Sequence, residues 1–372
     1  MDRKVIIAGF FPPPITGQGL ATQRLGELLH PHYDVECVNL RTDEEQLDLR
    51  LKGRLLHKVK QYRSAGQRLK QALDHSPGAT VFWTAISPQF FGHFRDLLTV
   101  LPTFGPQHDV YAVVHWGKFA HLFKSASTAL TAQRLSKKIK GFVFLNEDRS
   151  EQCAPWISSD KRFVIPNTLD SQVLCTKQEI EAKFTESNHR ESLNILFLSN
   201  MIQEKGYLDV LHAVQLLRKE SAPIKATFAG QWLSTEDKNA FDHYVNTHGL
   251  QHVVSHAGIV TDRAQIKALH LASDVFILPS YLIEGQPLTI IEAMNAGSPI
   301  ITTRLGGMVD MITENQEGFF VPPQSPSAIA EAARKLLHSD TRQNMARAAR
   351  QRYEEAYSAE YVTRQWRKIV EG

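Results

Sequence analysis

The chain has 372 residues, enough for two ordinary domains, and its 42% hydrophobic and 22% charged residues are typical of a folded globular protein and exclude a disordered one. No run of about 18 apolar residues occurs, so we expect no transmembrane helix. The start MDRKVIIAGFFPPP indicates a buried first strand rather than a signal peptide. The cysteines at 37, 153 and 175 form no CxxC pair, which argues against a cysteine metal site and favours a cytoplasmic location.

The net charge of +3 is unevenly distributed along the chain. Residues 1–170 carry 22 Lys and Arg against 16 Asp and Glu, and residues 171–372 carry 20 against 23. Much of the basic excess comes from Arg50–Lys70, which has eight basic residues and no acidic residue. Because the second half is acidic and no nucleic-acid-binding motif is present, we expect no nucleic-acid partner.

Twelve short apolar runs predict strands, in two series that are separated near residue 170. Helical patterns such as GLATQRLGELL and GYLDVLHAVQLLRK lie between several of the runs. Strands that alternate with helices predict parallel sheets covered on both faces, so we expect an α/β protein with two doubly wound domains. The predicted strands are Lys4–Gly9, Asp34–Asn39, Ala79–Thr84, Val110–His115, Gly141–Leu145, Arg162–Pro166, Asn194–Ser199, Ile224–Gly230, His252–Ala257, Asp274–Pro279, Pro299–Thr303 and Gly318–Val321.

The polar stretch 171–192 has little strand pattern and is interpreted as the join between the domains. We expect an N-terminal domain over 1–170 and a C-terminal domain over 171–352, with a last helix over about 353–372 packing back on the first. In open parallel sheets, ligands bind at the carboxyl ends of the strands. Two such domains therefore predict a site in a cleft across which they face each other.

Two loops of the N-terminal half carry candidate binding groups at predicted strand ends. Gly17 and Gly19 precede a helix in FFPPPITGQGLATQRL, and small residues there let backbone N–H groups approach an anion. The spacing matches neither usual nucleotide-binding glycine motif, and a connector without a ligand fits equally well. His115 ends a strand in VVHWGKF. A lone histidine there is more often structural, but its place at a strand's carboxyl end favours function.

Two loops of the C-terminal half carry more specific signals. In LFLSNMIQEKGYLDVL, Asn200 and Lys205 follow a strand, and Lys205 either reaches a phosphate or is a solvated residue beside a turn. In SYLIEGQPLTIIEAM, one glutamate lies on a Gly-Pro turn and another lies early in the helix behind it. Two carboxylates beside unpaired helix amides suit a hydroxylated, phosphorylated ligand such as a nucleotide sugar. The candidate residues of this stretch are Glu284, Gly285, Gln286, Pro287, Leu288 and Glu292.

The run EGQPLTIIEAM resembles the Glu-x7-Glu motif of the retaining glycosyltransferases of family 4, which have the GT-B fold. The segments VIPNTLD, LFLSNMIQEKGYLDVL, FAG, GIVTD, ASDVFILPS and GSPIITTRLGGMVDMITENQEGFFVPP resemble other motifs of that family, in its order and spacing. The resemblance is strong over roughly 160–340 and weaker before it. It implies two Rossmann-like domains, the second of which binds the nucleotide sugar.

The resemblance also implies roles for individual residues. Glu292 would bind the ribose hydroxyls and Glu284 would contact the donor sugar. Lys205 would bind the diphosphate and His115 would lie near the transferred sugar, so that Glu284, His115 and Lys205 form the catalytic set. The other implied donor-binding positions are Gly17, Gly19, Asn200, Ile259, Gly285, Gln286, Pro287 and Leu288.

One position departs from the family pattern. Asn200 stands where the family commonly has an arginine, so one of two cations on the diphosphate is replaced by a neutral group. Hydrogen bonds from a neutral donor are about half as strong as those from a charged one. Backbone amides must then contribute more to neutralising the diphosphate, or another basic residue such as Arg24 or Arg304 must contact it.

The implied reaction is transfer of a sugar, with retention, from a nucleotide diphosphate sugar to a glycan or a lipid-linked saccharide. Many relatives of this kind build bacterial capsule, O-antigen or exopolysaccharide. We expect no metal or other cofactor, since the chain has no Asp-x-Asp motif and no His/Cys cluster. Two alternatives stay open: a nucleotide-sugar epimerase of the same fold, which would need further acid/base residues, and a non-catalytic protein that binds sugar nucleotides.

The basic segment Arg50–Lys70 permits two interpretations. As a helix it would place Leu51, Leu55, Leu56 and Val59 on one stripe with cations around it, although Gly53 and Gly66 weaken the helix prediction. The stripe either packs on the first domain or faces an anionic membrane surface. The second interpretation predicts a peripheral enzyme at the inner face of the cell membrane.

Overall fold

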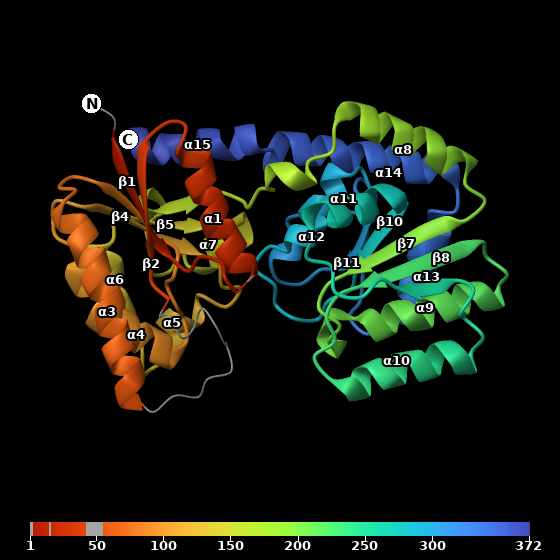
Figure 1. Cartoon of the computed structure of the whole chain (residues 1–372), viewed down its shortest axis with the longest axis horizontal. Helices are drawn as coiled ribbons and strands as arrows, with labels where there is room; N and C mark the ends of the chain where they lie inside the picture. The colour runs from red at the N-terminus through yellow and green to blue at the C-terminus, as the bar shows by residue number, and fades with distance from the viewer. Residues whose placement is uncertain (1–2, 15, 42–54) are drawn as a thin grey trace. The chain divides into compact units, whose positions relative to one another are not determined.

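The computed structural model describes residues 3–14, 16–41 and 55–372 (Figure 1). The chain divides into two compact units, an N-terminal unit of Met1–Thr168 with Ala359–Gly372 and a C-terminal unit of Leu169–Ser358. Each unit holds one six-stranded sheet, and the described strand pairs in both sheets are parallel. All twelve predicted strands occur, each within two residues of its predicted ends, which confirms the doubly wound α/β class.

The N-terminal sheet has the strand order β2-β1-β3-β4-β5-β6. Its central strands are buried almost throughout, which explains why they are continuous apolar runs in the sequence. The strands are β1 (Lys4–Gly9), β2 (Asp34–Asn39), β3 (Thr80–Trp83), β4 (Asp109–Val114), β5 (Gly141–Phe144) and β6 (Arg162–Val164). The helices are α1 (Gly17–Leu29), α3 (Leu55–Asp74), α4 (Phe90–Thr99), α5 (His121–Lys124), α6 (Ala129–Lys138), α7 (Glu147–Gln152) and α15 (Ala359–Glu371).

Two apolar clusters fill the two faces of the N-terminal sheet. One joins the sheet to α3, α5 and α6, and the other joins it to α1 and α15. In the second cluster the rings of Trp366 and Phe82 pack edge to face with centroids 4.9 Å apart. The last helix of the chain is thereby part of the N-terminal core (Figure 1).

The C-terminal sheet has the order β12-β11-β10-β7-β8-β9. Its strands are β7 (Leu193–Leu198), β8 (Ile224–Ala229), β9 (Val254–His256), β10 (Val275–Leu278), β11 (Ile300–Thr303) and β12 (Gly318–Val321). Its helices are α8 (Lys177–His189), α9 (Tyr207–Lys219), α10 (Thr235–Thr247), α11 (Arg263–Ala272), α12 (Leu288–Asn295), α13 (Pro326–Lys335) and α14 (Ser339–Arg352).

The stretch 171–192, interpreted from the sequence as the join, is part of the C-terminal unit and contains α8. A capping box between Thr176 and Glu179 starts this helix, and Ile180 and Phe184, one turn apart, are buried. Lys183 is buried too, and its Nζ donates to the carbonyl oxygens of His270 (2.9 Å) and Ala296 (2.7 Å). The stretch has the pattern of a linker because α8 directs only two large apolar side chains and one lysine stem to the core.

A glycine places the turn after β7 against the end of β10. Gly206 has φ +83°, and a Cβ there would lie 2.7 Å from Pro279 Cγ and 2.8 Å from its carbonyl oxygen. Any other residue would therefore combine an unfavourable backbone angle with a clash against backbone. This close approach sets the position of Lys205, the residue before it.

We expect Gly206→Ala to destabilise the C-terminal unit by roughly 1–3 kcal/mol, because backbone strain and overlap act together. Gly249→Ala is a matched control, since Gly249 has φ +62° but nothing within 4 Å of its Cβ position. The control should be destabilised by backbone strain alone, roughly 1–2 kcal/mol. Urea unfolding, with hydrogen exchange of the β10 amides, measures both. Equal losses in the two variants would contradict the close approach.

Candidate functional site

The predicted binding residues of the C-terminal unit lie on loops at the carboxyl ends of three strands. Asn200 and Lys205 follow β7, Ile259 follows β9, and Glu284 follows β10. Strands β10 and β7 are direct neighbours in the sheet. The structure thereby collects these residues at one edge, where ligands of open parallel sheets bind.

Lys205 and Glu284 form an ion pair between the loops after β7 and β10. Each side chain is 17% exposed, so both charges are partly desolvated yet accessible from solvent. Ser280 Oγ lies 3.1 Å from Glu284 Oε1 and also donates to the carbonyl of Glu204. The backbone N–H of Tyr281 donates to that same carbonyl at 2.9 Å. The two loops are therefore joined by backbone as well as by charge.

A second glycine supports the Glu284 loop from the other side. Gly306, after β11, has φ +58°, and a Cβ there would lie 2.6 Å from the Glu284 carbonyl oxygen. The N–H of Gly307 donates to that oxygen at 2.9 Å. Neither contact was expected from the sequence, where Gly306 and Gly307 are simply part of a loop. Arg304, considered as an extra cation for a diphosphate, stacks on the Phe320 ring at 4.1 Å.

Helix α12 begins directly behind Glu284, with Pro287 as its N-cap. The side chain of Pro287 makes no capping hydrogen bond, and the N–H of Ile290 donates to the Pro287 carbonyl oxygen at 3.2 Å, so the N–H groups of Leu288 and Thr289 are the ones directed out of the end of the helix. Gln286 is buried, whereas Gly285 and Leu288 are half-buried. The partial positive charge of the helix end therefore lies beside the Lys205–Glu284 pair, an arrangement that suits an anion.

Glu292 is buried one turn further along α12 and belongs to an ionic network that the sequence interpretation missed. Arg263 Nη2 lies 2.9 Å from Glu292 Oε1 and 2.6 Å from Asp170 Oδ2. His270 Nε2 lies 3.5 Å from the other carboxylate oxygen of Glu292. Burial lowers the pKa of His270, which favours its neutral form. Arg263 thus holds one oxygen of Glu292, and the ribose contact of this carboxylate stays a prediction.

No local signal could have identified this network. Arg263 lies 93 residues from Asp170 and 29 residues from Glu292 in the sequence. Asp170 precedes α8, Arg263 opens α11 and Glu292 lies in α12, so only the packed unit brings the three together.

In the N-terminal unit, Gly17 and Gly19 lie in the first turn of α1, whereas the sequence interpretation placed them before the helix. Thr16 is the N-cap, and its hydroxyl accepts a hydrogen bond from the Gly19 N–H at 3.0 Å. That amide is therefore engaged within the turn. A Cβ at Gly17 would meet nothing within 4 Å, whereas a Cβ at Gly19 would lie 3.0 Å from Thr16 Oγ1. Of the two glycines, only Gly19 is therefore in close contact with the rest of the chain.

His115 follows β4 and is half-buried. Its Nε2 is buried and has no hydrogen-bond partner among the described residues. Burial lowers the pKa of His115 to about 4, so the imidazole is neutral at pH 7. It lines a cavity of about 20 Å³ together with Arg24, whose guanidinium pairs with Glu27 at 2.8 Å. A neutral ring with an unpaired nitrogen can donate to or accept from a ligand hydroxyl.

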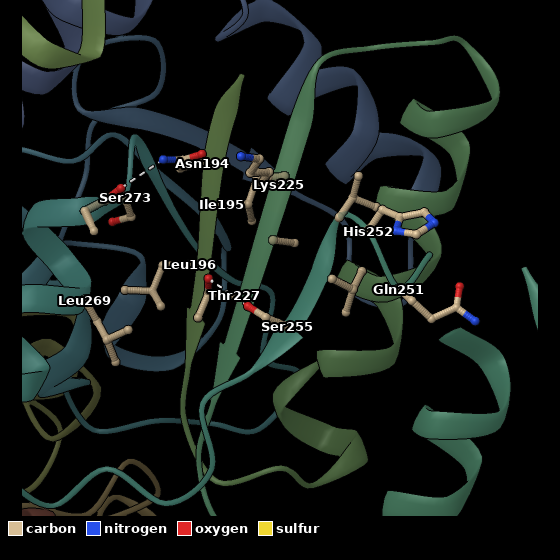
Figure 2. Close-up of a pocket in the computed structure, with 14 residues that line it drawn as sticks. Asn194, Ile195, Leu196, Lys225, Thr227, Gln251, His252, Ser255, Leu269 and Ser273 are labelled. Atoms are coloured by element: carbon tan, nitrogen blue, oxygen red, sulfur yellow. Dashed lines mark hydrogen bonds between the residues drawn. The ribbon is translucent and has the colours of Figure 1, made fainter. Parts of the chain in front are cut away.

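A separate cavity of about 350 Å³ lies in the C-terminal unit (Figure 2). Asn194 and Lys225 from the first residues of β7 and β8 line it, with the hydroxyls of Thr227 and Ser255 3.2 Å apart. This is the amino half of the strands, whereas the loops at their carboxyl ends carry Lys205 and Glu284. The position argues against this cavity as the binding site.

Among the described residues no group of three or more His, Cys, Asp or Glu side chains could hold a metal ion. In the same part of the chain, none of the helices is long and apolar enough to cross a bilayer.

The family model described as "Glycosyl transferases group 1" matches residues 179–352. The chain is thus similar to this family over somewhat less than half of its length. The matched segment runs from α8 to the end of α14 and includes Lys205, Glu284 and Glu292. The group 1 segment thus coincides with most of the C-terminal unit.

Two curated relatives are similar to the chain at low identity. The D-inositol 3-phosphate glycosyltransferase of Paenarthrobacter aurescens is 29% identical over 51% of this chain and 47% of the relative. The 2-deoxystreptamine N-acetyl-D-glucosaminyltransferase of Niallia circulans is 27% identical over 72% of this chain and 67% of the relative. The match thus spans about half the length of the first relative.

Among solved structures, HepE of Anabaena in complex with UDP and glucose superposes with a TM-score of 0.71 at 13% identity, over 100% of both chains. At that identity the likeness concerns the fold. It confirms the GT-B class that the sequence predicted.

We expect Arg263→Met to destabilise the C-terminal unit by roughly 1–3 kcal/mol, because Glu292 is left buried without its charged partner. Arg334→Met is the control, since Arg334 also pairs with a carboxylate, that of Glu220, but both partners are more than 40% exposed. The control should lose less than about 1 kcal/mol. Urea unfolding compares the two. A loss in Arg263→Met as small as in the control would contradict the structural importance of the network.

His115 should titrate near pH 4 rather than near its usual value of 6.5. Between these values the unfolded chain binds a proton that the folded chain does not, so stability falls as pH falls through this window. NMR titration of the imidazole measures the pKa directly. The stability difference between wild type and His115→Gln should change between pH 7 and pH 4, and a ring that titrates near 6.5 would contradict its burial.

Proposed function

We propose that this protein is a retaining glycosyltransferase, which moves a sugar from a nucleoside diphosphate sugar to a saccharide or lipid-linked saccharide acceptor. The observation that carries the proposal is the Lys205–Glu284 pair beside the uncapped start of α12, within a glycosyl transferases group 1 segment. Bond breaking gives an oxocarbenium-like centre and a diphosphate that gains negative charge. A fixed cation and helix amides beside that charge stabilise it as it develops.

In this proposal Lys205 and Glu284 have linked tasks. Glu284 holds the ammonium of Lys205 at the edge of the sheet, and the donor diphosphate replaces part of that ion pair. Glu284 can then accept hydrogen bonds from hydroxyls of the donor sugar. Asn200 is exposed after β7 and offers a neutral hydrogen-bond donor where family 4 commonly has an arginine. Neutralisation of the diphosphate charge therefore depends more strongly on Lys205.

The nucleoside would lie towards Glu292 and Ile259. Ile259 is 63% exposed on the loop after β9, and such an apolar surface suits the face of a base. Glu292 accepts the ribose hydroxyls with the carboxylate oriented by Arg263. The complex of HepE with UDP supports a nucleoside diphosphate as the leaving group.

No side chain is assigned here as a covalent nucleophile. The acceptor oxygen bonds to the anomeric carbon on the face from which the phosphate oxygen departs, and the acceptor proton passes to that phosphate. The neutral imidazole of His115 hydrogen-bonds a hydroxyl of the transferred sugar. The reaction needs no metal, because Lys205 and the α12 amides provide the positive charge.

We place the reaction in cell-surface polysaccharide biosynthesis, at the inner face of the cell membrane. The sequence resemblance to family 4 and the lipid-linked acceptors common among its members support this setting. An epimerase would instead interconvert free nucleotide sugars without an acceptor, and a binding protein would release no nucleotide.

Lys205→Met should lower turnover by about 10²–10³-fold, since the developing charge loses its cation. Lys335→Met is the matched control, because Lys335 also pairs with a glutamate but is 54% exposed on α13. Release of nucleoside diphosphate is measured with a panel of nucleotide sugars, with and without saccharide acceptors. Wild-type turnover in Lys205→Met would place the diphosphate elsewhere.

Glu292→Gln should weaken donor binding by roughly 1–3 kcal/mol, while Glu284→Gln should lower turnover more than affinity. Calorimetric titration of the donor and initial rates separate the two effects. Product anomers identified by NMR test retention. Reversible isomerisation of the donor would favour the epimerase, and binding without release of nucleotide would favour the non-catalytic protein.

A further inference from the structure

Helix α4 of the N-terminal unit buries two polar side chains and exposes three of its five large apolar ones, while Leu97 packs on the core. Phe91 is 84% exposed, Leu98 76% and Phe90 48%. His93 and Asp96 on the opposite side are buried. Exposed large apolar side chains opposite buried polar ones are an informative departure from the usual pattern of a surface helix.

Hydrogen bonds fix this orientation of α4. Asp96 accepts from the backbone N–H of Ser87 at 2.9 Å and from Arg95 Nε at 2.8 Å. His93 Nε2 lies 2.8 Å from the hydroxyl of Thr131 in α6. Rotating the helix to bury its phenylalanines would separate Asp96 from the Ser87 N–H and His93 from Thr131, although Arg95, on the same helix, would turn with Asp96. The outward apolar face is therefore built into the unit and is not a consequence of loose packing.

Basic helices lie on both sides of α4. Beyond the His93–Thr131 contact, Lys138 Nζ of α6 donates to the Leu101 carbonyl after α4 at 2.7 Å. On the other side α3 approaches closely, since a Cβ at Gly66 would lie 2.5 Å from the Thr99 carbonyl oxygen. These contacts make α3, α4 and α6 neighbours on the N-terminal unit (Figure 1).

The charged exposed residues of the flanking helices are mainly cationic, with Asp74 near the end of α3 as the one acidic residue among those described. Helix α6 has no acidic residue, and Leu130 on its outer side is 72% exposed. We call the combined region the α4 surface. It consists of the apolar residues Phe90, Phe91, Leu98 and Leu130 and the exposed cations Arg63, Lys70, Arg134 and Lys137.

We propose that the α4 surface binds an anionic lipid bilayer. Its phenylalanines and leucines would enter the boundary between headgroups and acyl chains, and its cations would contact lipid phosphates. A second copy of the chain fits less well, because a twofold contact through this surface would bring like charges together. The inference rests on the proposed function in one respect: if the acceptor is a lipid-linked saccharide, the bilayer bound by the α4 surface would present it.

The α4 surface differs from the membrane contact that the sequence predicted. That prediction used the stripe Leu51, Leu55, Leu56 and Val59, whose side chains all lie outside the part of the chain that the structure describes. In the described part of α3, Ala65, Leu69 and Leu73 are buried in the core, so this part packs its apolar side on the unit. In the α4 surface, the apolar side chains that would contact lipid are mainly those of α4, namely Phe90, Phe91 and Leu98.

Sedimentation of the full chain with vesicles tests the proposal, using phosphatidylcholine with and without phosphatidylglycerol. Wild type should bind the anionic vesicles, and high salt should weaken binding. Phe91→Ser with Leu98→Ser should lower the partition coefficient at least about tenfold, since two inserted apolar side chains are lost. Arg134→Glu with Lys137→Glu should lower it similarly on anionic vesicles only.

Two controls match these variants in the other unit. Leu233→Ser removes an exposed leucine (57% exposed), and Lys238→Glu with Lys335→Glu reverses two exposed cations. Both should bind as wild type does. The vesicles contain no nucleotide sugar, so the outcome does not depend on transferase activity. Circular dichroism and thermal unfolding curves like those of the wild type show that the α4 variants are folded. Wild type that ignores anionic vesicles, or equal losses in variants and controls, would overturn the proposal. A wild-type dimer that Phe91→Ser with Leu98→Ser makes monomeric would assign the surface to self-association and overturn it too.

Discussion

The ion pair between Lys205 and Glu284 depends on backbone placement more than on charge. Lys205 ends the short 3-10 helix Gln203–Lys205 and Glu284 lies on a loop, and these two segments must approach closely for the carboxylate and the ammonium to meet. Gly206 against Pro279 and Gly306 against Glu284 make this approach possible, because a Cβ at either glycine would overlap backbone atoms. The ion pair therefore forms only when the segments after β7, β10 and β11 are packed against one another at the carboxyl ends of the strands.

The two glutamates of the motif have different surroundings, and this difference suits different tasks. Glu284 is at the surface with a lysine that a diphosphate can attract away. Glu292 is buried and bound to Arg263, whose other partner is Asp170. A buried carboxylate that keeps its cation is costly to move, so Glu292 suits a fixed contact with the nucleoside. Glu284 suits a contact that changes during the reaction.

The N-terminal unit shows how polar groups can determine where apolar ones go. Asp96 meets the Ser87 N–H, and His93 Nε2 meets Thr131, only when α4 directs them inward, and Phe91 and Leu98 are then exposed. Exposing large apolar side chains to water costs free energy that a soluble helix normally avoids. The exposed apolar side chains of α4 lie beside cationic residues of α6 and α3. An anionic bilayer would neutralise these cations, whereas a second copy of the chain would bring like charges together.

The sequence by itself determined the strands, their order of alternation with helices, and the loop positions of Lys205, Glu284 and His115. These features are local, since a period of two or of 3.6 residues and a strand-turn-helix order are readable within about twenty residues. The pairing of Arg263 with Asp170 and Glu292, and the packing of α8 through Ile180 and Phe184, were decided only by the tertiary structure. Their partners are distant in the sequence, and a pattern cannot say which carboxylate an arginine will meet. The same holds for α4, because the periodicity of FFGHFRDLLT is identical whichever face is inward, and only the hydrogen bonds from Ser87 and Thr131 decide that the polar face is buried.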